Sequence, residues 1–364
     1  MKPSDKVKVL CMLPSLQAGG AERILVTFMN NIDRDRFAPI FVALDHGEGP
    51  VKEWINDDVE FYALNCGSVK ASIFKLRNFI KEHQPDVLFT TMVHSNALAI
   101  AMKLFFPDLR VIVREAALPS SILNGYGAKG RFCYFIYKYL YPKADIVISN
   151  CSQVIDEFKN TLKIKMENHT LLFNPVDTKR IVSKKIENTE NKKIINFLCV
   201  GRLSYEKGYD RLVQKIAEKF TPDFEWSLEI IGEGSFRPEL EKLINTKNLN
   251  HKIKLSGHKQ QPWDGISTTS VLLLPSRWEG MPNTVLEGLS CGVPCIAIRD
   301  AGGISDIGKH TKGNDLTIVD TMDAFIEAMI TIASTKIHEA ALPAVFSLPT
   351  VMNQFEELLI PIKN

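Results

Sequence analysis

The sequence predicts an α/β protein built of two Rossmann-like domains that face a central cleft. Three observations support this prediction: strand patterns alternate with helix patterns along the chain, the strand segments are short apolar runs, and a polar stretch interrupts the alternation near the middle. Continuous apolar runs are typical of parallel strands buried on both faces, and their alternation with helices is typical of doubly wound sheets. With 364 residues, 45% of them hydrophobic, the chain is long enough for two cores.

The first half of the chain alternates between strands and helices from its start. Apolar residues at helical spacing, such as Ile24, Leu25, Phe28 and Met29, predict the first helix. The predicted strands are residues 7–13, 40–44, 87–90, 111–113 and 146–148, and the predicted helices are residues 21–32 and 72–82.

A domain boundary is predicted where the polar stretch begins. Residues 177–193 are rich in Lys, Glu and Asn and contain no aromatic residue. We therefore expect an N-terminal domain over residues 1–175, a C-terminal domain over 176–345, and a final segment, 346–364, as a helix that returns to the N-terminal domain. The expected strands of the second domain are residues 194–200, 228–231, 253–256, 271–274 and 293–298, and its helices are residues 209–219, 238–245 and a helix that starts at 283.

Composition limits the classes of function. The net charge of +2 argues against nucleic acid as a partner. Met1 leads into an apolar run, residues 7–13, that is too short for a secretory signal or a membrane span, so we expect a cytoplasmic protein, with peripheral contact to the inner face of the membrane left open. The seven cysteines form no Cys-x-x-Cys pair, which favours reduced, buried thiols without zinc.

Glu279 and Glu287 are the most informative residues of the chain. They lie in a predicted strand, turn, helix and strand unit with the sequence SVLLLPSRWEGMPNTVLEGLSCGVPCIAI. The carboxyl edge of a parallel sheet is where α/β proteins bind ligands, and a helix N-terminus there offers N–H groups to an anion. Glu279 is expected beside these donors, whereas Glu287, about one turn into the helix, suits the hydroxyls of a sugar or ribose. The alternative is that both acids only favour the start of a helix.

This segment resembles the E-x7-E motif of the retaining glycosyltransferases called family 4, which have the GT-B fold, and the resemblance extends over almost the whole chain. A second match is the loop Gly201-Arg-Leu-Ser-Tyr-Glu-Lys-Gly208, similar to the family's G-R-x-x-x-x-K-G pattern. Arg202 and Lys207 suit a diphosphate that gains negative charge as its bond to the sugar breaks. A pair of solvated surface charges is the alternative.

The resemblance implies a donor site for a nucleotide sugar, with UDP as the expected nucleotide. The residues it assigns to the donor are Gly19, Gly20, Gly201, Arg202, Lys207, Gly232, His258, Glu279, Gly280, Met281, Pro282, Asn283, Thr284 and Glu287. Those expected to act in catalysis are Glu279, Arg202, Lys207 and His94. His94 is a substitute, because relatives commonly have a His after the strand at 111–113, where this chain has Arg114, Glu115 and Ala116.

The acceptor is expected on the N-terminal domain. The loop Leu16-Gln-Ala-Gly-Gly-Ala-Glu-Arg23 includes the G-G-A-E-R string of many lipid-sugar transferases, so the resemblance implies that Glu22 and Arg23 contact the acceptor. A tight turn with a solvated Arg is the alternative. Arg114 and Glu115 are expected on a loop after a strand and are also assigned to the acceptor.

Two further stretches admit more than one interpretation. Asp33-Arg-Asp35 is a D-x-D string, which is the metal site of a different transferase fold, but here we expect a solvated turn and no metal or other cofactor. Residues 126–143 interleave aromatic residues with Lys129, Arg131, Lys138 and Lys143. They predict either an amphipathic patch on an anionic membrane or a core-facing helix, and periodicity favours the helix.

The predicted function is that of a retaining, metal-independent GT-B glycosyltransferase. The resemblance implies transfer of a hexose or N-acetylhexosamine from a UDP-sugar to a lipid-linked or lipopolysaccharide acceptor, in the assembly of bacterial surface polysaccharide such as O antigen. The stretch Gln261-Pro262-Trp263 is similar to that of lipopolysaccharide core galactosyltransferases. The alternatives are a non-catalytic sugar-binding subunit and another nucleotide-sugar enzyme of the same fold, such as an epimerase.

Overall fold

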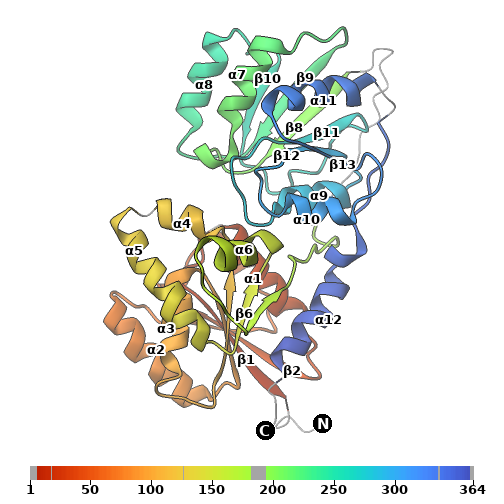
Figure 1. The fold of residues 1–364 in the computed structure, drawn as a ribbon. Coiled ribbons are helices and arrows are strands. Elements are labelled where there is room, and N and C mark those ends of the chain that lie inside the picture. The colour runs from red at the N-terminus through yellow and green to blue at the C-terminus, as the bar shows by residue number, and fades with distance from the viewer. Residues whose placement is uncertain (1–5, 18, 126, 182–193, 335–336, 361–364) are drawn as a thin grey trace. The chain divides into compact units, whose positions relative to one another are not determined.

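The computed structural model of the protein contains two compact units, which we call unit 1 and unit 2 (Figure 1). Unit 1 comprises Met1–Pro175 together with Leu348–Asn364, and unit 2 comprises Val176–Ser347. The structure describes residues 6–17, 19–125, 127–181, 194–334 and 337–360.

Unit 1 is built on a parallel sheet of seven strands in the order β3-β2-β1-β4-β5-β6-β7. Apolar residues that are buried on both faces form its central strands, as expected for a parallel sheet covered by helices. The strands are β1 (Val7–Leu13), β2 (Phe37–Ala43), β3 (Glu60–Ala63), β4 (Val87–Thr91), β5 (Arg110–Glu115), β6 (Ile146–Ser149) and β7 (His169–Leu171).

Helices connect these strands. The helices of unit 1 are α1 (Gly20–Asn31), α2 (Val69–His83), α3 (Val93–Met102), α4 (Pro119–Gly125), α5 (Ala128–Phe135), α6 (Ser152–Asp156) and α12 (Leu348–Leu359). Short 3-10 and π helices are η2 (Pro50–Trp54), η3 (Ile136–Leu140), η4 (Tyr141–Lys143) and η5 (Glu157–Thr161).

The last helix, α12, completes the core of unit 1. Val351, Met352, Phe355 and Leu359 of α12 belong to the same buried cluster as the apolar residues of β1 and α1. The ring of Phe355 lies 4.3 Å from that of Phe28, measured between centroids. The apolar side of α12 therefore packs against residues more than 300 positions earlier in the chain.

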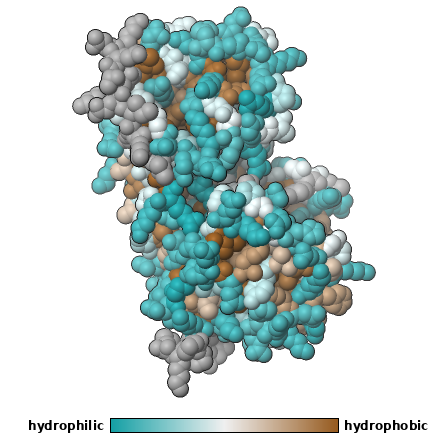
Figure 2. Space-filling view, turned by 180° about the vertical axis from the view of Figure 1, so that it is seen from behind, coloured by the Kyte–Doolittle hydropathy of each residue, from teal (hydrophilic) through white to brown (hydrophobic). Residues whose placement is uncertain are grey.

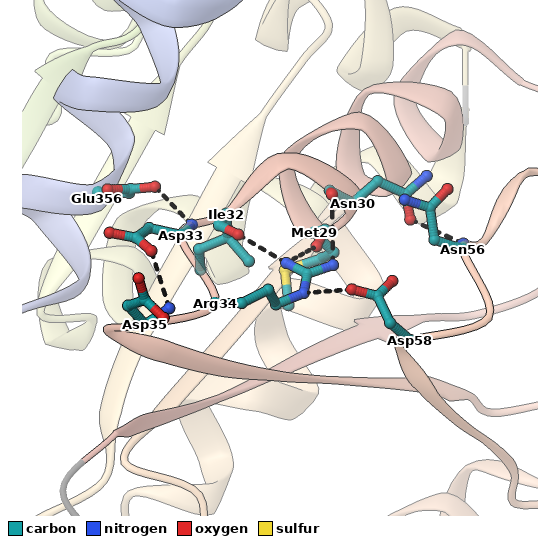
Figure 3. Close-up of polar contacts among 9 residues, drawn as sticks. All are labelled: Met29, Asn30, Ile32, Asp33, Arg34, Asp35, Asn56, Asp58 and Glu356. Carbon is teal, nitrogen blue, oxygen red and sulfur yellow. Dashed lines mark hydrogen bonds and ion pairs between the residues drawn. The ribbon is translucent and has the colours of Figure 1, made fainter. Parts of the chain in front are cut away.

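The Asp33-Arg34-Asp35 string forms a turn that fastens α1 in place (Figure 3). Oδ1 of Asp33 accepts the backbone N–H of Asp35, and Glu356 of α12 accepts the backbone N–H of Asp33, each over 2.8 Å. Arg34 donates to Asp58 and to backbone carbonyls at the end of α1. Those carbonyls belong to Met29, Asn30 and Ile32. The predicted turn is confirmed, but Arg34 satisfies the open end of the helix rather than projecting into solvent.

Unit 2 repeats the plan with a parallel sheet of six strands in the order β10-β9-β8-β11-β12-β13. Its strands are β8 (Ile195–Val200), β9 (Trp226–Ile231), β10 (Ile253–Gly257), β11 (Ser270–Leu274), β12 (Cys295–Ile298) and β13 (Leu316–Val319). Its helices are α7 (Tyr209–Lys219), α8 (Arg237–Thr246), α9 (Asn283–Ser290), α10 (Ile304–His310) and α11 (Met322–Ser334), with 3-10 turns η6 (Tyr205–Lys207) and η7 (Ala344–Phe346).

The predicted fold class is confirmed by these two parallel sheets with their helices. Three strands escaped the sequence analysis, β3, β7 and β13, which lie at sheet edges and are three or four residues long. The strand expected over residues 40–44 instead spans Phe37–Ala43, and the one expected over 293–298 begins at Cys295. Within the described residues, no helix is long and apolar enough to cross a membrane.

Candidate active site

The candidate site lies at the carboxyl edge of the unit 2 sheet. The strand order reverses between β8 and β11, and α/β sheets bind ligands beside such a reversal. The loop after β8 runs from Gly201 to Gly208, and the loop after β11 runs from Pro275 to Pro282. These are the two loops in which the sequence analysis placed Lys207 and Glu279.

Lys207 and Glu279 form an ion pair. Nζ of Lys207 donates to Oε1 of Glu279 over 2.6 Å, and Oγ of Ser276 donates to the same oxygen over 2.8 Å. The two charged side chains are 18% and 13% exposed, so the pair is largely withdrawn from solvent. A cation and a carboxylate thus meet where a charged ligand would reach the sheet edge.

A second pair, Asp210 with Arg277, joins the first turn of α7 to the loop after β11. Nη1 and Nη2 of Arg277 donate to the two carboxylate oxygens of Asp210 over 2.7 and 2.8 Å. The guanidinium carbon lies 3.8 Å from the ring centroid of Tyr205, and the backbone N–H of Arg277 donates to the carbonyl of Glu206. Planar two-point pairing and ring stacking both suit Arg rather than Lys. The pair therefore sets the position of η6, which ends in Lys207.

The pKa values of this second pair reflect its mutual stabilisation. Partial burial raises the pKa of Asp210, but the hydrogen bonds and charge of Arg277 outweigh burial and lower it overall. The hydrogen bond to Asp210 raises the pKa of Arg277. Arg211, the next residue on α7, donates to the carbonyls of Pro275 and Ser276, each over 2.8 Å. Burial lowers the pKa of Arg211.

Two glycines allow the loops after β8, β9 and β11 to approach one another closely. Gly208 has φ +68°, and a Cβ there would collide with the carbonyl oxygen of Pro275. Gly232 has φ +148°, and a Cβ there would collide with the carbonyl oxygen of Gly201. Both positions require glycine because its backbone alone fits the conformation and the space.

Glu287 lies in a buried environment. It is 6% exposed on α9, and its Oε2 accepts the indole N–H of Trp263 over 3.1 Å. Trp263 is itself 1% exposed. Neither glutamate caps α9, which has no side-chain cap hydrogen bond; Glu279 pairs with Lys207, and Glu287 accepts from Trp263.

The other residues expected at the donor surround this edge. Arg202 and His258 are exposed in the loops after β8 and β10. Gly280 accepts the backbone N–H of Gly303 over 2.6 Å, which joins the β11 loop to the β12 loop. Met281 and Pro282 are buried, while Asn283 and Thr284 are half-buried in the first turn of α9.

In unit 1, Gly19 and Gly20 occur where the resemblance places them, at the start of α1. Glu22 is 7% exposed, and a Cβ on Gly19 would collide with its carboxylate, so this side chain folds back over the first turn. A negatively charged side chain in the first turn is stabilised by the helix dipole and by the free N–H groups there. Arg23 is exposed on the same helix.

Arg114 and Glu115 are not on a loop, and this expectation was wrong. They are the last residues of β5 and are 1% and 3% exposed, so neither offers a surface to an acceptor. Nη2 of Arg114 donates to Oδ1 of Asn174 over 2.5 Å, while its Nε and Nη1 are buried with no hydrogen-bond partner among the described residues. Burial lowers the pKa of Arg114 to about 10.

Glu115 belongs to a buried polar network at the end of β5. It accepts the hydroxyl of Tyr141 over 2.7 Å, and this hydroxyl in turn accepts Nδ2 of Asn96 over 2.8 Å. Burial raises the pKa of Glu115 and, with the charge of Glu115, the pKa of Tyr141. These residues support the sheet edge rather than line its surface.

His94 is exposed near the start of α3, directly after β4. The preceding Met92 has φ +74°, a strained conformation for a residue with a side chain. The strand order of the unit 1 sheet reverses between β1 and β4, so His94 and Gly19 follow the two strands on either side of that reversal.

Several residues of the site escaped the sequence analysis. Their partners are distant in sequence, as in the pair of Asp210 with Arg277, which are 67 residues apart. The signal that could have identified Trp263 was the Gln261-Pro262-Trp263 stretch, which was noted without a role. The missed residues are Asp210, Arg211, Trp263, Ser276 and Arg277.

Comparisons with known proteins agree with this architecture. Residues 18–180 match the model of "Glycosyltransferase Family 4", and residues 179–342 match that of "Glycosyl transferases group 1". A relative from Campylobacter jejuni, an N-acetylgalactosaminyltransferase that acts on a diphospho-undecaprenol-linked saccharide, is 23% identical over 87% of each chain. The lipopolysaccharide 1,6-galactosyltransferase of Escherichia coli is 34% identical over 46% of this chain and 47% of its own.

A solved structure shows the same fold over nearly the full chain. The crystal structure of Anabaena HepE in complex with UDP and glucose superposes with a TM-score of 0.75 at 18% identity, covering 97% of this chain and 99% of that one. Together, the two family models cover most of the sequence, residues 18–342, and both match glycosyltransferase families. The chain therefore belongs to the family 4 glycosyltransferases of the GT-B fold.

Proposed function

We propose that the protein transfers a hexose or N-acetylhexosamine from a UDP-sugar to a lipid-linked or lipopolysaccharide acceptor, with retention of the anomeric configuration. The observation that carries this proposal is the Lys207–Glu279 ion pair, positioned between two loops at the strand-order reversal of unit 2. The proposal extends to the assembly of bacterial surface glycans, and it is supported by relatives whose names give diphospho-undecaprenol-linked and lipopolysaccharide substrates.

The donor diphosphate would bind to Arg202 and Lys207. The ammonium group of Lys207 already pairs with the carboxylate of Glu279. Bound phosphate oxygens would either displace this carboxylate or bind the ammonium group together with it. The exposed guanidinium of Arg202, on the same loop, would supply a second cation. Preorganised cations stabilise charge that develops in a transition state more than they stabilise the ground state.

The two glutamates would hold different parts of the donor. Glu279, with the backbone from Gly280 to Asn283, would contact the sugar that moves. Glu287, oriented by the indole of Trp263, would accept hydrogen bonds from ribose hydroxyls. Glu22 and Arg23 of α1 would contact the acceptor, and His94 would contact the transferred sugar.

The reaction would take place on one face of the sugar. The bond from the anomeric carbon to the diphosphate oxygen breaks, the acceptor hydroxyl oxygen bonds to that carbon, and the hydroxyl proton passes to the departing phosphate. This route retains configuration without a carboxylate nucleophile. Arg202 and Lys207 would stabilise the diphosphate, so the proposed mechanism requires no divalent metal.

A direct test combines nucleotide release with product analysis. The purified protein is incubated with UDP-, GDP- and ADP-sugars, with and without an undecaprenyl-diphosphate-linked saccharide, and released nucleotide is measured. We expect acceptor-dependent UDP release and an anomeric coupling constant in the product that matches the donor. Binding of the nucleotide sugar without turnover would indicate a sugar-binding subunit. Conversion of the sugar without an acceptor would indicate an epimerase. A product with inverted anomeric configuration would indicate a different mechanism.

A further inference from the structure

The outer face of α5 and η3 carries a stripe of exposed aromatic side chains. Phe132, Phe135 and Tyr139 follow one another at three- and four-residue spacing and are 58%, 51% and 50% exposed. Residues at this spacing lie on one side of a helix. The opposite side is fully buried and comprises Cys133, Ile136, Tyr137 and Tyr141. The inner side therefore packs in the core of unit 1, and this packing gives no reason for the aromatic side chains on the outer side.

Cations flank this stripe. Lys129, Arg131, Lys138 and Lys143 are all exposed, and residues 128–143 contain no Asp or Glu. Nζ of Lys138 lies 5.5 Å from the ring centroid of Tyr139. A segment that combines exposed aromatic rings with cations and has no acid of its own complements a surface that is apolar beneath and negatively charged above.

Exposed apolar side chains also occur on α2 and just after α3, and α3 contacts both α2 and η3. Leu104 and Phe105, in the turn after α3, are 82% and 46% exposed, and Phe74 of α2 is 66% exposed. The guanidinium carbon of Arg77 on α2 lies 5.3 Å from the ring centroid of Phe105. In Figure 1, α2 and α3 are neighbours on unit 1. Figure 2, which views the molecule from behind, shows that hydrophobic residues also reach the surface of this unit on that side.

We infer that this face of unit 1, the α5–η3 stripe with its four cations, binds the surface of an anionic phospholipid bilayer. Aromatic rings prefer the boundary between headgroups and acyl chains, and Lys and Arg bind the negative headgroups above it. A second copy of the chain is a poorer occupant, because two such faces would bring four cations against four. The sequence admitted a core-facing helix, which periodicity favoured, or a membrane patch. In the structure one side of the segment is buried in the core of unit 1, and the other side is the exposed stripe.

This inference goes beyond the proposed sugar transfer and requires neither donor nor acceptor. It has a consequence for the proposed function, since a lipid-linked acceptor lies in a membrane. The ring of His94 stacks on that of Phe132 with centroids 6.5 Å apart, so the stripe begins beside the loop that follows β4. Membrane contact would therefore occur next to the residues proposed to meet the sugar.

Vesicle flotation tests the inference without any substrate. The full chain is mixed with vesicles of phosphatidylcholine alone or with added phosphatidylglycerol, and the floated fraction is measured at low and high salt. We expect binding only to the anionic vesicles, weakened by salt because the contact is electrostatic. Changing Lys129, Arg131 and Lys138 together to Gln should lower the partition coefficient ~10²-fold.

The aromatic stripe is tested separately. The double variant Phe132→Ser with Phe135→Ser should lower binding ~10-fold or more, whereas Phe132→Trp with Phe135→Trp should keep it, because Trp also favours the interface. A matched control changes three exposed lysines of unit 2 to Gln, with the same loss of charge and no expected loss of binding. These are Lys242, Lys254 and Lys312.

Three outcomes would overturn the inference. Wild-type protein that does not float with anionic vesicles would do so, even if it transfers sugar normally. Equal losses of vesicle binding in the triple variants of unit 1 and unit 2 would show that binding depends only on the net charge of the protein. Concentration-dependent self-association that the Ser variant abolishes, without vesicle binding, would identify the stripe as an interface between copies. Retained vesicle binding in a protein without transferase activity would instead contradict only the proposed function.

Discussion

Nζ of Lys207 lies 2.6 Å from Oε1 of Glu279, although the two residues are 72 positions apart in the sequence. The ion pair joins the loop after β8 to the loop after β11, and a bound diphosphate would compete with the carboxylate for the ammonium. Each partner is therefore positioned by the other until a charged ligand arrives.

Replacing the proposed diphosphate cations should slow the reaction. Lys207→Ala and Arg202→Ala should each lower kcat by ~10² or more, the scale of losing one preorganised donor in a transition state. Steady-state nucleotide release measures the effect. Lys242→Ala on α8 is a control with the same chemistry at an exposed position. A double Lys207→Ala, Arg202→Ala variant with wild-type activity would remove the diphosphate assignment.

Replacing the two glutamates should separate binding from chemistry. Glu287→Gln should chiefly raise KM for the donor, because ribose does not change during the reaction. Glu279→Gln should chiefly lower kcat, because it contacts the sugar whose charge and position change. Kinetics on both variants, with UDP affinity measured alongside, are the test. Loss of UDP affinity in Glu279→Gln alone would reverse the two roles.

Trp263→Phe offers a more specific test of Glu287. The change removes the indole N–H that donates to Oε2 of Glu287 and keeps an aromatic ring in the buried site. Losing a hydrogen bond to a charged group corresponds to ~10-fold or more in donor affinity if this bond orients the carboxylate. Thermal unfolding of the same variant shows whether the core is intact. An unchanged KM in a folded variant would mean that the indole does not orient Glu287.

The Asp210–Arg277 pair should contribute to stability in a pH-dependent way. Because the folded state lowers the pKa of Asp210, its contribution is fully present above the unfolded-state pKa of about 3.9 and is lost as the pH falls through the lower folded value. Asp210→Asn should cost about 1–3 kcal/mol at neutral pH. Denaturant unfolding at neutral and acidic pH measures it. A stability difference that does not narrow below about pH 4 would contradict the proposed role of the pair.

Chelation should leave sugar transfer almost unchanged. The described residues contain no group of three or more His, Cys, Asp or Glu side chains that could hold a metal, and the proposal assigns the work of a cation to Arg202 and Lys207. Activity is compared before and after EDTA treatment and gel filtration. A loss of activity that Mg²⁺ or Mn²⁺ restores would overturn the metal-free mechanism.

Much of the fold could be predicted because buried parallel strands have a strong sequence pattern. β8 and β11 were located within one residue of their observed bounds. Short edge strands such as β7, with three residues and partial exposure, lack that pattern. β5 extends through Arg114 and Glu115, whose charges resemble a loop in sequence although both are buried.

The sequence predicted the residues of the candidate site that belong to short motifs, but it did not predict the contacts between them. Lys207 and Glu279 belong to short local patterns, but their contact depends on the order of β8 and β11 in the sheet. Glu287 and its partner Trp263 are 24 residues apart in sequence, and Asp210 and Arg277 are 67 residues apart. No local sequence pattern predicts contacts over such separations. Long-range polar contacts follow from topology rather than from local propensity.

The packing of α12 on unit 1 has a consequence for how the chain is made. Unit 2 occupies one continuous stretch, Val176–Ser347, and all of it leaves the ribosome before α12 does. Until then, the buried rings of Phe28 and Phe89 lack their partner Phe355. A chain that emerges from its N-terminus therefore completes the earlier unit last, and during translation the apolar residues of unit 1 that α12 covers stay exposed, as in the incomplete folds that are prone to aggregate.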